Sequence, residues 1–478
     1  MEIIDLVIFI IYMIVMLGVG IYFLKSNKTA DDYYVGGRKI GPWHVGLSVV
    51  ATDVGGGFSI GLGGLGFTMG LSGSWMLFTG LIGAWLAAVF LIPKINKLAH
   101  KINLLTFPQV FGHFYGKNVA IVAGIISAVG YLGFTASQIL AGAKLAGATF
   151  SALDTDMAIY IMGGIAVIYT VMGGLKAVIY TDTIQWILLM SGLIFIGIPM
   201  SYSAVGGYDA IVESINPELL TFTNITWVQI VNWAITIIPI WFVGMTLYQR
   251  IYACKDVKDA KKAWFIAGLF EWPIMALMGT VLGLLARVAL DQGLFVHEGF
   301  SAIGDLDSEK GLPLLLKTIL PPGLMGLMMS AYFSAIMSTA DSCLMAASGN
   351  IVTDLIGNRG KKFGHLKLSQ LATLIIGALS IFIALSVESV LDTMLLSYGF
   401  MVSGLFVPVL GALFTKRVSA TASLVAMISG GLTTVILEQF FKNYLPFGLD
   451  ANIYGILVSA ILFIFITIVD PKTKIKTL

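Results

Sequence analysis

Long apolar stretches recur along the whole chain and constrain its fold more than any other feature. Each is long enough to cross the roughly 30 Å hydrocarbon core of a bilayer as a helix of about 20 residues. Of the 478 residues, 58% are hydrophobic and only 11% are charged. Soluble proteins carry about 25% charged residues. The sequence therefore predicts an all-α polytopic membrane protein.

The connections between these stretches alternate in charge. Lys and Arg follow the odd-numbered spans, as in the cluster from Arg250 to Lys262 after the seventh, whereas even connections such as 206–225 are poor in both. Because cytoplasmic loops carry the excess of Lys and Arg, this pattern predicts an N-terminus outside and a C-terminus in the cytoplasm, in the cell (inner) membrane. We count about thirteen spans: 3–24, 42–70, 72–94, 118–150, 156–174, 177–205, 226–248, 262–290, 322–355, 366–387, 390–415, 419–441 and 452–470.

Two of the spans are interrupted. Glycines break 42–70, and Pro239 interrupts 226–248. The two lie five spans apart, so the halves that they begin run through the membrane in opposite directions. Interrupted helices at matching positions of two halves are typical of transporters built from inverted repeats. Pro and Gly are also common in ordinary membrane helices, which is the alternative interpretation.

A carboxylate accompanies the first interruption. Asp53 lies in an otherwise uncharged stretch and precedes a run of glycines that includes Gly55 and Gly56. A charge at mid-membrane depth costs roughly 2.5–3.5 kcal/mol on insertion scales, so it is usually functional and partnered. Glycines let a helix open and offer its backbone carbonyls. We therefore predict an ion or substrate site at the bilayer midplane.

The ninth span carries hydroxyl groups and a second carboxylate. At 100° per residue, one helix face holds Ala335, Ser338, Thr339 and Ser342, and Asp341 flanks Ser338. Neighbouring hydroxyls and carbonyls suit a hard monovalent cation. Hydrogen bonding between helices is the alternative for the Ser/Thr pair, and Asp341 favours an ion path.

Four further residues have weaker signals. Asp182 follows Lys176 near a cytoplasmic end, where position alone predicts an acid at a helix start. Glu271 lies inside the eighth span, where it either pairs with a basic loop residue or faces the bundle interior. We expect Lys144 to reach the outer membrane interface. Trp241 has either a cavity-lining or an aromatic packing role.

The sequence also excludes several classes of protein. HExxH, GxSxG and Walker motifs are missing, so we predict no enzyme activity and no cofactor. The net charge of +2 is too small to indicate nucleic-acid binding. Two cysteines and five scattered histidines give no metal site other than one for sodium. Transport by such a chain would use an ion gradient.

The chain resembles the sodium:solute symporter family over nearly its whole length. Five ordered motifs carry the resemblance: Ala30–Arg38, Ala51–Gly57, Tyr169–Gln185, Tyr248–Arg250 and Ala335–Ser342. The resemblance implies a LeuT-type core of ten helices in two inverted repeats. We accordingly divide the chain into an extra helix and cytoplasmic loop (1–41), repeat 1 (42–205), an extracellular loop (206–225), repeat 2 (226–415), and two further helices with a cytoplasmic tail (416–478).

The same resemblance implies the binding residues. For the principal sodium site these are Ala51, Val54, Ala335, Ser338 and Thr339. The resemblance also implies Asp182 in a further cation site, to which we assign Asp341 and Ser342 as possible members. We assign five residues to substrate binding or coupling: Asp53, Gly55, Gly56, Trp241 and Gln138.

The resemblance divides over the substrate. Asp53 is similar to an aspartate of sodium/proline symporters, where sugar-transporting members have a neutral residue. The segments Val54–Gly57 and Met337–Ser342 resemble high-affinity choline transporters, which carry an aromatic residue in place of Asp53. We expect sodium-coupled symport of a small nitrogenous solute, such as proline or a betaine- or choline-like amine, by alternating access in the lipid bilayer. The alternatives are a sugar or sialic acid symporter, a proton-coupled carrier, a channel and a membrane sensor.

Overall fold

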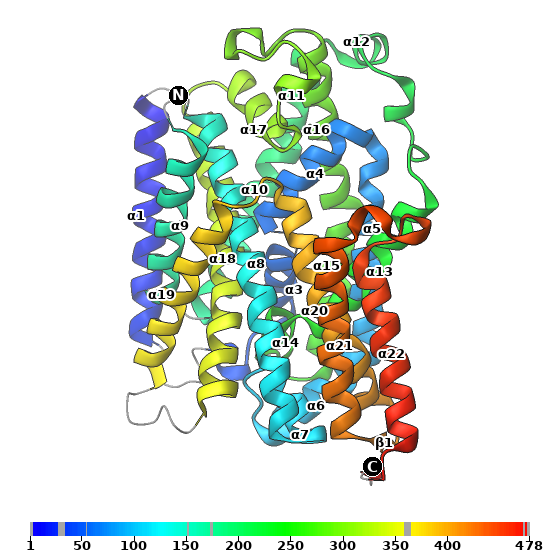
Figure 1. The fold of residues 1–478 in the computed structure, drawn as a ribbon. Coiled ribbons are helices and arrows are strands. Elements are labelled where there is room, and N and C mark those ends of the chain that lie inside the picture. The colour runs from blue at the N-terminus through cyan, green and yellow to red at the C-terminus, as the bar shows by residue number, and fades with distance from the viewer. Residues whose placement is uncertain are drawn as a thin grey trace.

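The computed structural model describes residues 3–26, 34–53, 55–150, 153–172, 175–357, 365–471 and 474–475. These residues form an elongated bundle of helices, whose long axes run roughly parallel (Figure 1). The expected all-α architecture is confirmed. The strands β1 (Arg417–Val418) and β2 (Lys474–Ile475) are two residues each and pair antiparallel.

The first part of the chain begins with one peripheral helix and continues into the helices of the predicted first repeat. Its helices are α1 (Ile3–Ser26), η1 (Gly36–Arg38), α3 (Pro42–Asp53), α4 (Gly55–Met69), η2 (Gly70–Ser74), α5 (Trp75–Leu86), η3 (Ala87–Leu91), α6 (Ile92–Ile102), α7 (Pro108–Tyr115), α8 (Lys117–Thr149), α9 (Thr155–Met172), α10 (Leu175–Gly192), η4 (Leu193–Gly197) and α11 (Ile198–Ala204).

Short helices connect this part to the helices of the predicted second repeat. Two further long helices follow the second repeat. These elements are α12 (Gly207–Ser214), η5 (Pro217–Leu220), α13 (Trp227–Val243), α14 (Met245–Ala253), α15 (Val257–Leu269), η6 (Phe270–Met275), α16 (Ala276–Asp291), η7 (Val296–Glu298), η8 (Ile303–Asp305), α17 (Ser308–Ile319), α18 (Leu324–Gly349), η9 (Asn350–Ile356), α19 (His365–Ala384), α20 (Val390–Phe414), α21 (Ala420–Phe440), η11 (Lys442–Tyr444), η12 (Pro446–Gly448) and α22 (Ala451–Val469).

Many helices of the second half begin at a side chain that accepts a backbone N–H bond. Thr226 accepts from Gln229 before α13, and Ser389 accepts from Asp392 before α20. Such caps satisfy one of the N–H groups that the first turn of a helix leaves unpaired. These starts are therefore fixed by local sequence.

The interrupted first span is two helices, as expected, with the change of direction at one residue. α3 ends at Asp53 and α4 begins at Gly55, which has φ +50. A side chain at Gly55 would be strained in this left-handed conformation. The Cβ would also lie 2.3 Å from Oγ1 of Thr339 on α18. Gly55 is thus required both by the turn and by the close approach of α18.

The later glycines of α4 have a different role from the one we expected. They do not open the helix, because α4 is regular from Gly55 to Met69. Instead they bring it close to α16. A Cβ on Gly66 would lie 2.2 Å from the Thr280 carbonyl, and one on Gly283 would lie 2.0 Å from the Gly63 carbonyl. Small residues allow such backbone contact between membrane helices.

The second interruption lies at Gly244, so the expectation of a break at Pro239 is wrong. Pro239 is inside α13, which continues to Val243. Gly244 then adopts an extended conformation (φ -67, ψ 112), and α14 leaves at an angle of 44° to α13. The missing N–H of Pro239 does not end the helix because the turns on either side keep their own bonds.

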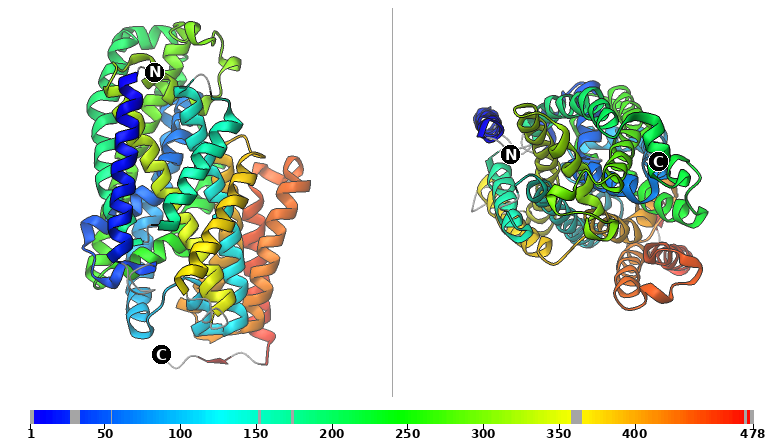
Figure 2. Two further views of the ribbon diagram at one scale, coloured as in Figure 1. Left: turned by 90° about the vertical axis from the view of Figure 1, so that its left-hand side faces the viewer. Right: turned by 90° about the horizontal axis from the view of Figure 1, so that it is seen from above.

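Eight helices among the described residues are long and apolar enough to cross a membrane, or nine if the bent pair α13–α14 is one span. The count of about thirteen therefore stays a prediction. α18 lies inside the bundle, and α21 and α22 pack together at its side (Figures 1 and 2). The chain begins at one end of the bundle and finishes at the other (Figure 2).

Candidate functional site

The break between α3 and α4 faces the hydroxyl side of α18. Thr339 Oγ1 lies 3.0 Å from the carbonyl oxygen of Ala51 and 3.3 Å from that of Ala335. The carbonyl of Ala51 is available because the helix ends two residues later and leaves its last carbonyls without intrahelical partners. Three of the five predicted sodium ligands are thus brought together. Val54 lies outside the described residues.

Ser338, the fifth predicted ligand, points toward another group. Its hydroxyl donates to the Asp182 carboxylate, and Ser48 on α3 donates to the same carboxylate. Asp182 is 1% exposed and is the eighth residue of α10. The interpretation of Asp182 as an acid at a helix start is therefore wrong. It is a buried acceptor that joins α3, α10 and α18.

Arg250 supplies the positive charge at this cluster, a role that we did not predict from the sequence. We assigned it to a cytoplasmic loop, but it is in α14 and fully buried. Its Nη2 lies 3.4 Å from Asp182 Oδ2 and 2.9 Å from Ser342 Oγ. Its Nε lies 3.2 Å from the Ser48 carbonyl. A buried charge is stable only when it is paired and bonded in this way.

Arg250 could have been found from its spacing within the sequence. It follows Gly244 by six residues, so a helix that restarts at the break carries it to the second turn of α14 instead of a loop. The charge count of the loop gave the wrong answer, because four other basic residues nearby satisfy the positive-inside rule without it: Lys255, Lys258, Lys261 and Lys262.

Asp341 lies on α18 but faces a different neighbour from Ser338. Thr170 on α9 donates to its Oδ1, and no donor among the described residues reaches its Oδ2. Asp341 is 1% exposed. The predicted second cation site therefore has one carboxylate, Asp182, that binds an arginine and another, Asp341, with a free oxygen.

Two side chains of α8 bind the starts of the two helices that follow the breaks. Gln138 Oε1 accepts the Gly57 N–H of α4 at 3.2 Å, and Tyr131 Oη accepts the Thr246 N–H of α14 at 3.1 Å. The first N–H groups of a helix have no intrahelical partner. Tyr131 and Gln138 are seven residues apart, which places them on one helix face. This pair holds both breaks against one surface.

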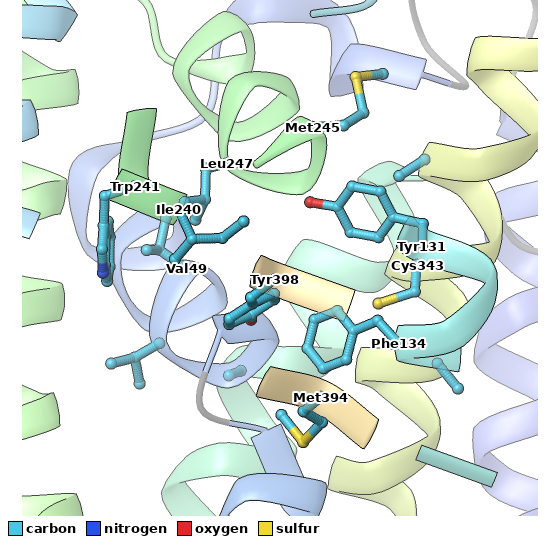
Figure 3. Close-up of a cluster of buried hydrophobic side chains, with 14 of the residues drawn as sticks. Val49, Tyr131, Phe134, Ile240, Trp241, Met245, Leu247, Cys343, Met394 and Tyr398 are labelled. Atoms are coloured by element: carbon cyan, nitrogen blue, oxygen red, sulfur yellow. The ribbon is translucent and has the colours of Figure 1, made fainter. Parts of the chain in front are cut away.

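Asp53 is 6% exposed and lies at the last residue of α3. Tyr398 on α20 donates to its Oδ1 at 3.2 Å. Tyr398 packs edge-on against Phe134 with ring centroids 5.0 Å apart. Figure 3 shows Tyr398, Phe134 and Tyr131 in one group between the helices. The aspartate therefore faces an aromatic region and not the Thr339 hydroxyl.

Trp241 lies apart from that group. Its ring packs edge-on against Trp264 on α15, with centroids 6.4 Å apart. It fills the space left by Gly83 on α5, where a Cβ would lie 2.4 Å from its Cδ1. These contacts give Trp241 an aromatic packing role between α13, α5 and α15. Gly56, also assigned to substrate binding, is in the first turn of α4.

Lys144 lies near the end of α8, as expected, but its side chain is buried and does not snorkel outward. It is 3% exposed. Its Nζ lies 2.6 Å from Oε2 of Glu309, in the first turn of α17, and 2.7 Å from Oδ2 of Asp307, the cap of that helix. Glu309 also accepts the Val390 and Leu391 N–H groups at 2.9 and 3.0 Å. One carboxylate therefore joins α8, α17 and the start of α20. These residues border a cavity of about 720 Å³.

Comparison with known families identifies the chain from residues 33–430, which match the model of the sodium:solute symporter family. The chain belongs to the sodium:solute symporter family. The expected resemblance is confirmed. This sodium:solute symporter is 28% identical to the osmoregulated proline transporter OpuE of Bacillus subtilis, over 89% of this chain and 87% of that one.

Other relatives in the family differ in substrate. The chain is 28% identical to the sodium/proline symporter of Escherichia coli, over 91% of this chain and 88% of that one. It is 25% identical to the sodium/glucose cotransporter 1 of Ovis aries, over 91% of this chain and 72% of that one. All three relatives are transporters.

Solved structures share the fold. A Na⁺-coupled sialic acid symporter in a substrate-bound outward-open state has a TM-score of 0.80 and 22% identity, covering 99% of this chain and 100% of that one. Mhp1, a nucleobase-cation-symport-1 family transporter, has a TM-score of 0.58 and 13% identity, covering 90% of this chain and 93% of that one. The all-helical architecture is therefore that of a known class of symporters.

Proposed function

We propose that this sodium:solute symporter imports a small nitrogenous solute, with proline as the first candidate, by sodium-coupled alternating access. The contact of Thr339 with Ala51 across the broken helix carries the proposal. It places a hydroxyl and two carbonyl oxygens around one point between α3 and α18, and oxygen ligands suit a small hard cation. Two of the relatives above are named for proline and one of these for sodium and proline.

A sodium ion at this point would lie between these oxygens, and the Thr339 hydroxyl would keep its proton but turn it away from the Ala51 carbonyl. We propose the carbonyls of Ala51, Val54 and Ala335 and the hydroxyls of Ser338 and Thr339 as its ligands. Such an ion would join α3 to α18 and favour the conformation that it binds. Coupling follows because a ligand shifts an equilibrium only by its difference in affinity for the two states.

We keep Asp182, Asp341 and Ser342 as the proposed second cation site. Arg250 already supplies a positive charge to Asp182 and a hydrogen bond to Ser342. A cation that binds Asp182 would therefore have to displace the guanidinium. The free Oδ2 of Asp341 is the oxygen that needs no such displacement.

Thirteen spans and two inverted repeats are part of the same proposal. The pair α3–α4 corresponds to α13–α14, and α8 corresponds to α18, which packs against it. The N-terminus would face outward and the C-terminus the cytoplasm of the cell (inner) membrane. The proximity of both breaks to one face of α8 supports a shared site between the halves.

The sodium gradient supplies enough free energy for import. One charge that crosses 100 mV provides about 2.3 kcal/mol. This corresponds to roughly a forty- to fiftyfold gradient of a neutral solute, before the sodium concentration gradient is added. The bonded cluster of Lys144 and Glu309 would close the outer side while the solute leaves inward.

The test is uptake into proteoliposomes with Ser338→Ala combined with Thr339→Ala. We expect this variant to lose sodium stimulation, because two ligand oxygens are removed. Ser348→Ala on the same helix is the matched control, since the Ser348 hydroxyl donates to the Met345 carbonyl of its own helix. Sodium stimulation that persists in the double variant would contradict the proposed sodium site.

The substrate is tested by sodium-dependent uptake over a panel of proline, choline, betaine, pantothenate, glucose and sialic acid. We expect saturable uptake of a nitrogenous solute with counterflow, which separates a carrier from a channel. Replacing sodium by potassium at fixed pH separates sodium coupling from proton coupling. Uptake of glucose or sialic acid alone would favour the alternative substrates.

A further inference from the structure

Glu271 is a membrane carboxylate that the proposed transport mechanism does not use. It lies in η6, between α15 and α16, and is fully buried. No N–H or O–H donor of the described residues reaches either of its oxygens. Its side chain occupies a recess beside Gly80 on α5, where a Cβ would lie 1.9 Å from Oε2. The fold thus makes room for a carboxylate without supplying donors for it.

The Glu271 carboxyl group faces that of Asp53. The two lie within hydrogen-bonding range of each other. Among the described residues, the one other group that bonds to Asp53 is the Tyr398 hydroxyl, at 3.2 Å. Two acidic groups, from the end of α3 and from η6, therefore meet inside the bundle beside the first break.

Within the part of the chain that the structure describes, the elements around this pair bring no positive charge to it. α5 has no charged residue, and Arg287 of α16 pairs with Asp291. The lysines of α15 lie in its first two turns, as Lys262 does over Trp43. Arg250 of α14 is bonded to Asp182.

The other described titratable groups near the pair are two tyrosines, a cysteine and two acids, none of which carries a positive charge in either protonation state. Asp53 lies close enough to act electrostatically on three of them: Tyr398 on α20, Tyr131 on α8 and Cys343 on α18. Of the acids on elements packed against α3, Asp182 faces Arg250 and Asp341 faces Thr170. None of these groups offsets the charge of two carboxylates.

Two buried carboxylates repel each other and have lost their hydration, so the pair is stable when it shares a proton or holds a cation between the two groups. We propose that Asp53 and Glu271 form a binding site for one monovalent positive charge, separate from the sodium site at Thr339. Its ligand is either a sodium ion or the ammonium group of the transported solute. The inference rests on the proposed function and extends it to the class of solute that the carrier accepts.

The position of the pair explains how its occupancy would affect transport. Asp53 is the last residue of α3, one residue before the undescribed Val54 and two before Gly55. A cation held between Asp53 and Glu271 fixes the end of α3 against η6. A solute with an ammonium group would therefore be favoured over a sugar, which has no positive charge to place there.

The experiment measures binding to the purified full chain and compares wild type with Glu271→Gln. The first arm titrates sodium without solute, at constant ionic strength, and follows tryptophan fluorescence. The second arm compares proline with cyclopentanecarboxylate, which lacks the ammonium group, at saturating sodium. Loss of the carboxylate charge should weaken one of these by about tenfold or more, since bonds to charged groups are the strong ones.

Each outcome decides for or against the pair. Weaker sodium binding assigns the site to sodium, and loss of the preference for proline with unchanged sodium binding assigns it to the ammonium group. If neither sodium binding nor the preference for proline changes in Glu271→Gln, the proposal is overturned. Glu271→Asp, which keeps the charge, should recover part of the affinity. Glu438→Gln is the matched control, because Glu438 bonds to Lys442 at the surface.

The same measurements separate this inference from the proposed function. Sodium-dependent binding that is equal in wild type and Glu271→Gln would leave symport intact and remove the cation site. Wild-type protein without any sodium dependence would contradict the proposed function, and the proline arm would still decide for or against the pair.

Discussion

At the scale of single residues, the buried polar groups of this chain form separate clusters with different partners. Ala51, Ala335 and Thr339 share oxygen atoms at the first break. Asp182 and Arg250 form an ion pair that lies next to this site through Ser338. Asp341 and Asp53 bond to other helices. The proposed sodium site and the ion pair share Ser338, whereas Asp341 and Asp53 have partners of their own.

Breaking the Asp182–Arg250 pair should strongly destabilise the protein. Arg250→Met leaves an uncompensated buried carboxylate, and Asp182→Asn leaves a buried guanidinium without its counter-charge. We expect each to cost about 3–5 kcal/mol. The double variant should recover part of this loss, because neither charge then remains. Thermal unfolding of the four proteins in detergent measures the cycle, and additive losses would show that the pair is not coupled.

Gly55→Ala should abolish sodium-stimulated uptake. The new Cβ would meet Thr339 Oγ1 at 2.3 Å, and φ +50 strains any residue other than glycine. The Thr339 hydroxyl would be pushed away from the Ala51 carbonyl. Gly164→Ala on α9 is the matched control, since its Cβ meets nothing within 4 Å. Wild-type sodium dependence in Gly55→Ala would mean that Thr339 is not a ligand.

At the scale of elements, the helices around the site are joined by a few specific contacts. α8 binds the starts of α4 and α14 through Gln138 and Tyr131. The carboxylate of Glu309 binds α8 and the start of α20. When the two halves move relative to each other, these contacts either break or move together with the helices that they join. The Glu309 contacts are the ones nearest the predicted outer surface.

Lys144→Gln should therefore favour an outward-open conformation. The substitution removes the charge that holds Glu309 and Asp307 against α8. Leu140, at the border of the outer cavity, is 1% exposed. In a background without the two buried native cysteines, we expect a Leu140→Cys reporter to react several-fold faster with an impermeant maleimide.

The control for this reporter is Lys310→Gln. Lys310 borders the same cavity but forms no ion pair in the part of the chain that the structure describes. Equal labelling rates in Lys144→Gln and Lys310→Gln would exclude Lys144 as part of the outer closure.

At the scale of the whole molecule, the long helices run between two ends that the sequence predicts to face opposite sides of a membrane. α1 begins at one end, and α22 finishes at the other (Figure 1). The loop around η5 lies at the end where α1 begins, and α6 and α7 lie at the opposite end (Figure 1). The orientation of this bundle is the property that a labelling experiment tests directly.

Two single cysteines measure that orientation in intact cells. Glu218→Cys lies in the exposed loop 206–225. Asp256→Cys replaces the residue that caps α15, at the predicted cytoplasmic end. We expect an impermeant maleimide to label Glu218→Cys from outside. Asp256→Cys should react only after the membrane is permeabilised. The reverse pattern would invert the proposed topology.

Much of the architecture could be predicted because hydropathy and spacing act locally. A helix in lipid must bury its backbone bonds and expose apolar side chains, so each span is readable from its own residues. The break at Gly55 was likewise predicted from nearby glycines. We placed the second break at Pro239 and not at Gly244. A proline shows that one backbone hydrogen bond of the helix is missing, but it does not show whether the turns on either side continue.

By itself, the sequence determined the helical membrane class, the broken first helix and the motif residues that meet at Thr339. Only the tertiary structure decided the partners of the buried charges: Arg250 with Asp182, Lys144 with Glu309, and Glu271 with Asp53. The physical reason is that hydropathy is a property of a segment, whereas the stability of a buried charge depends on groups that are distant in sequence.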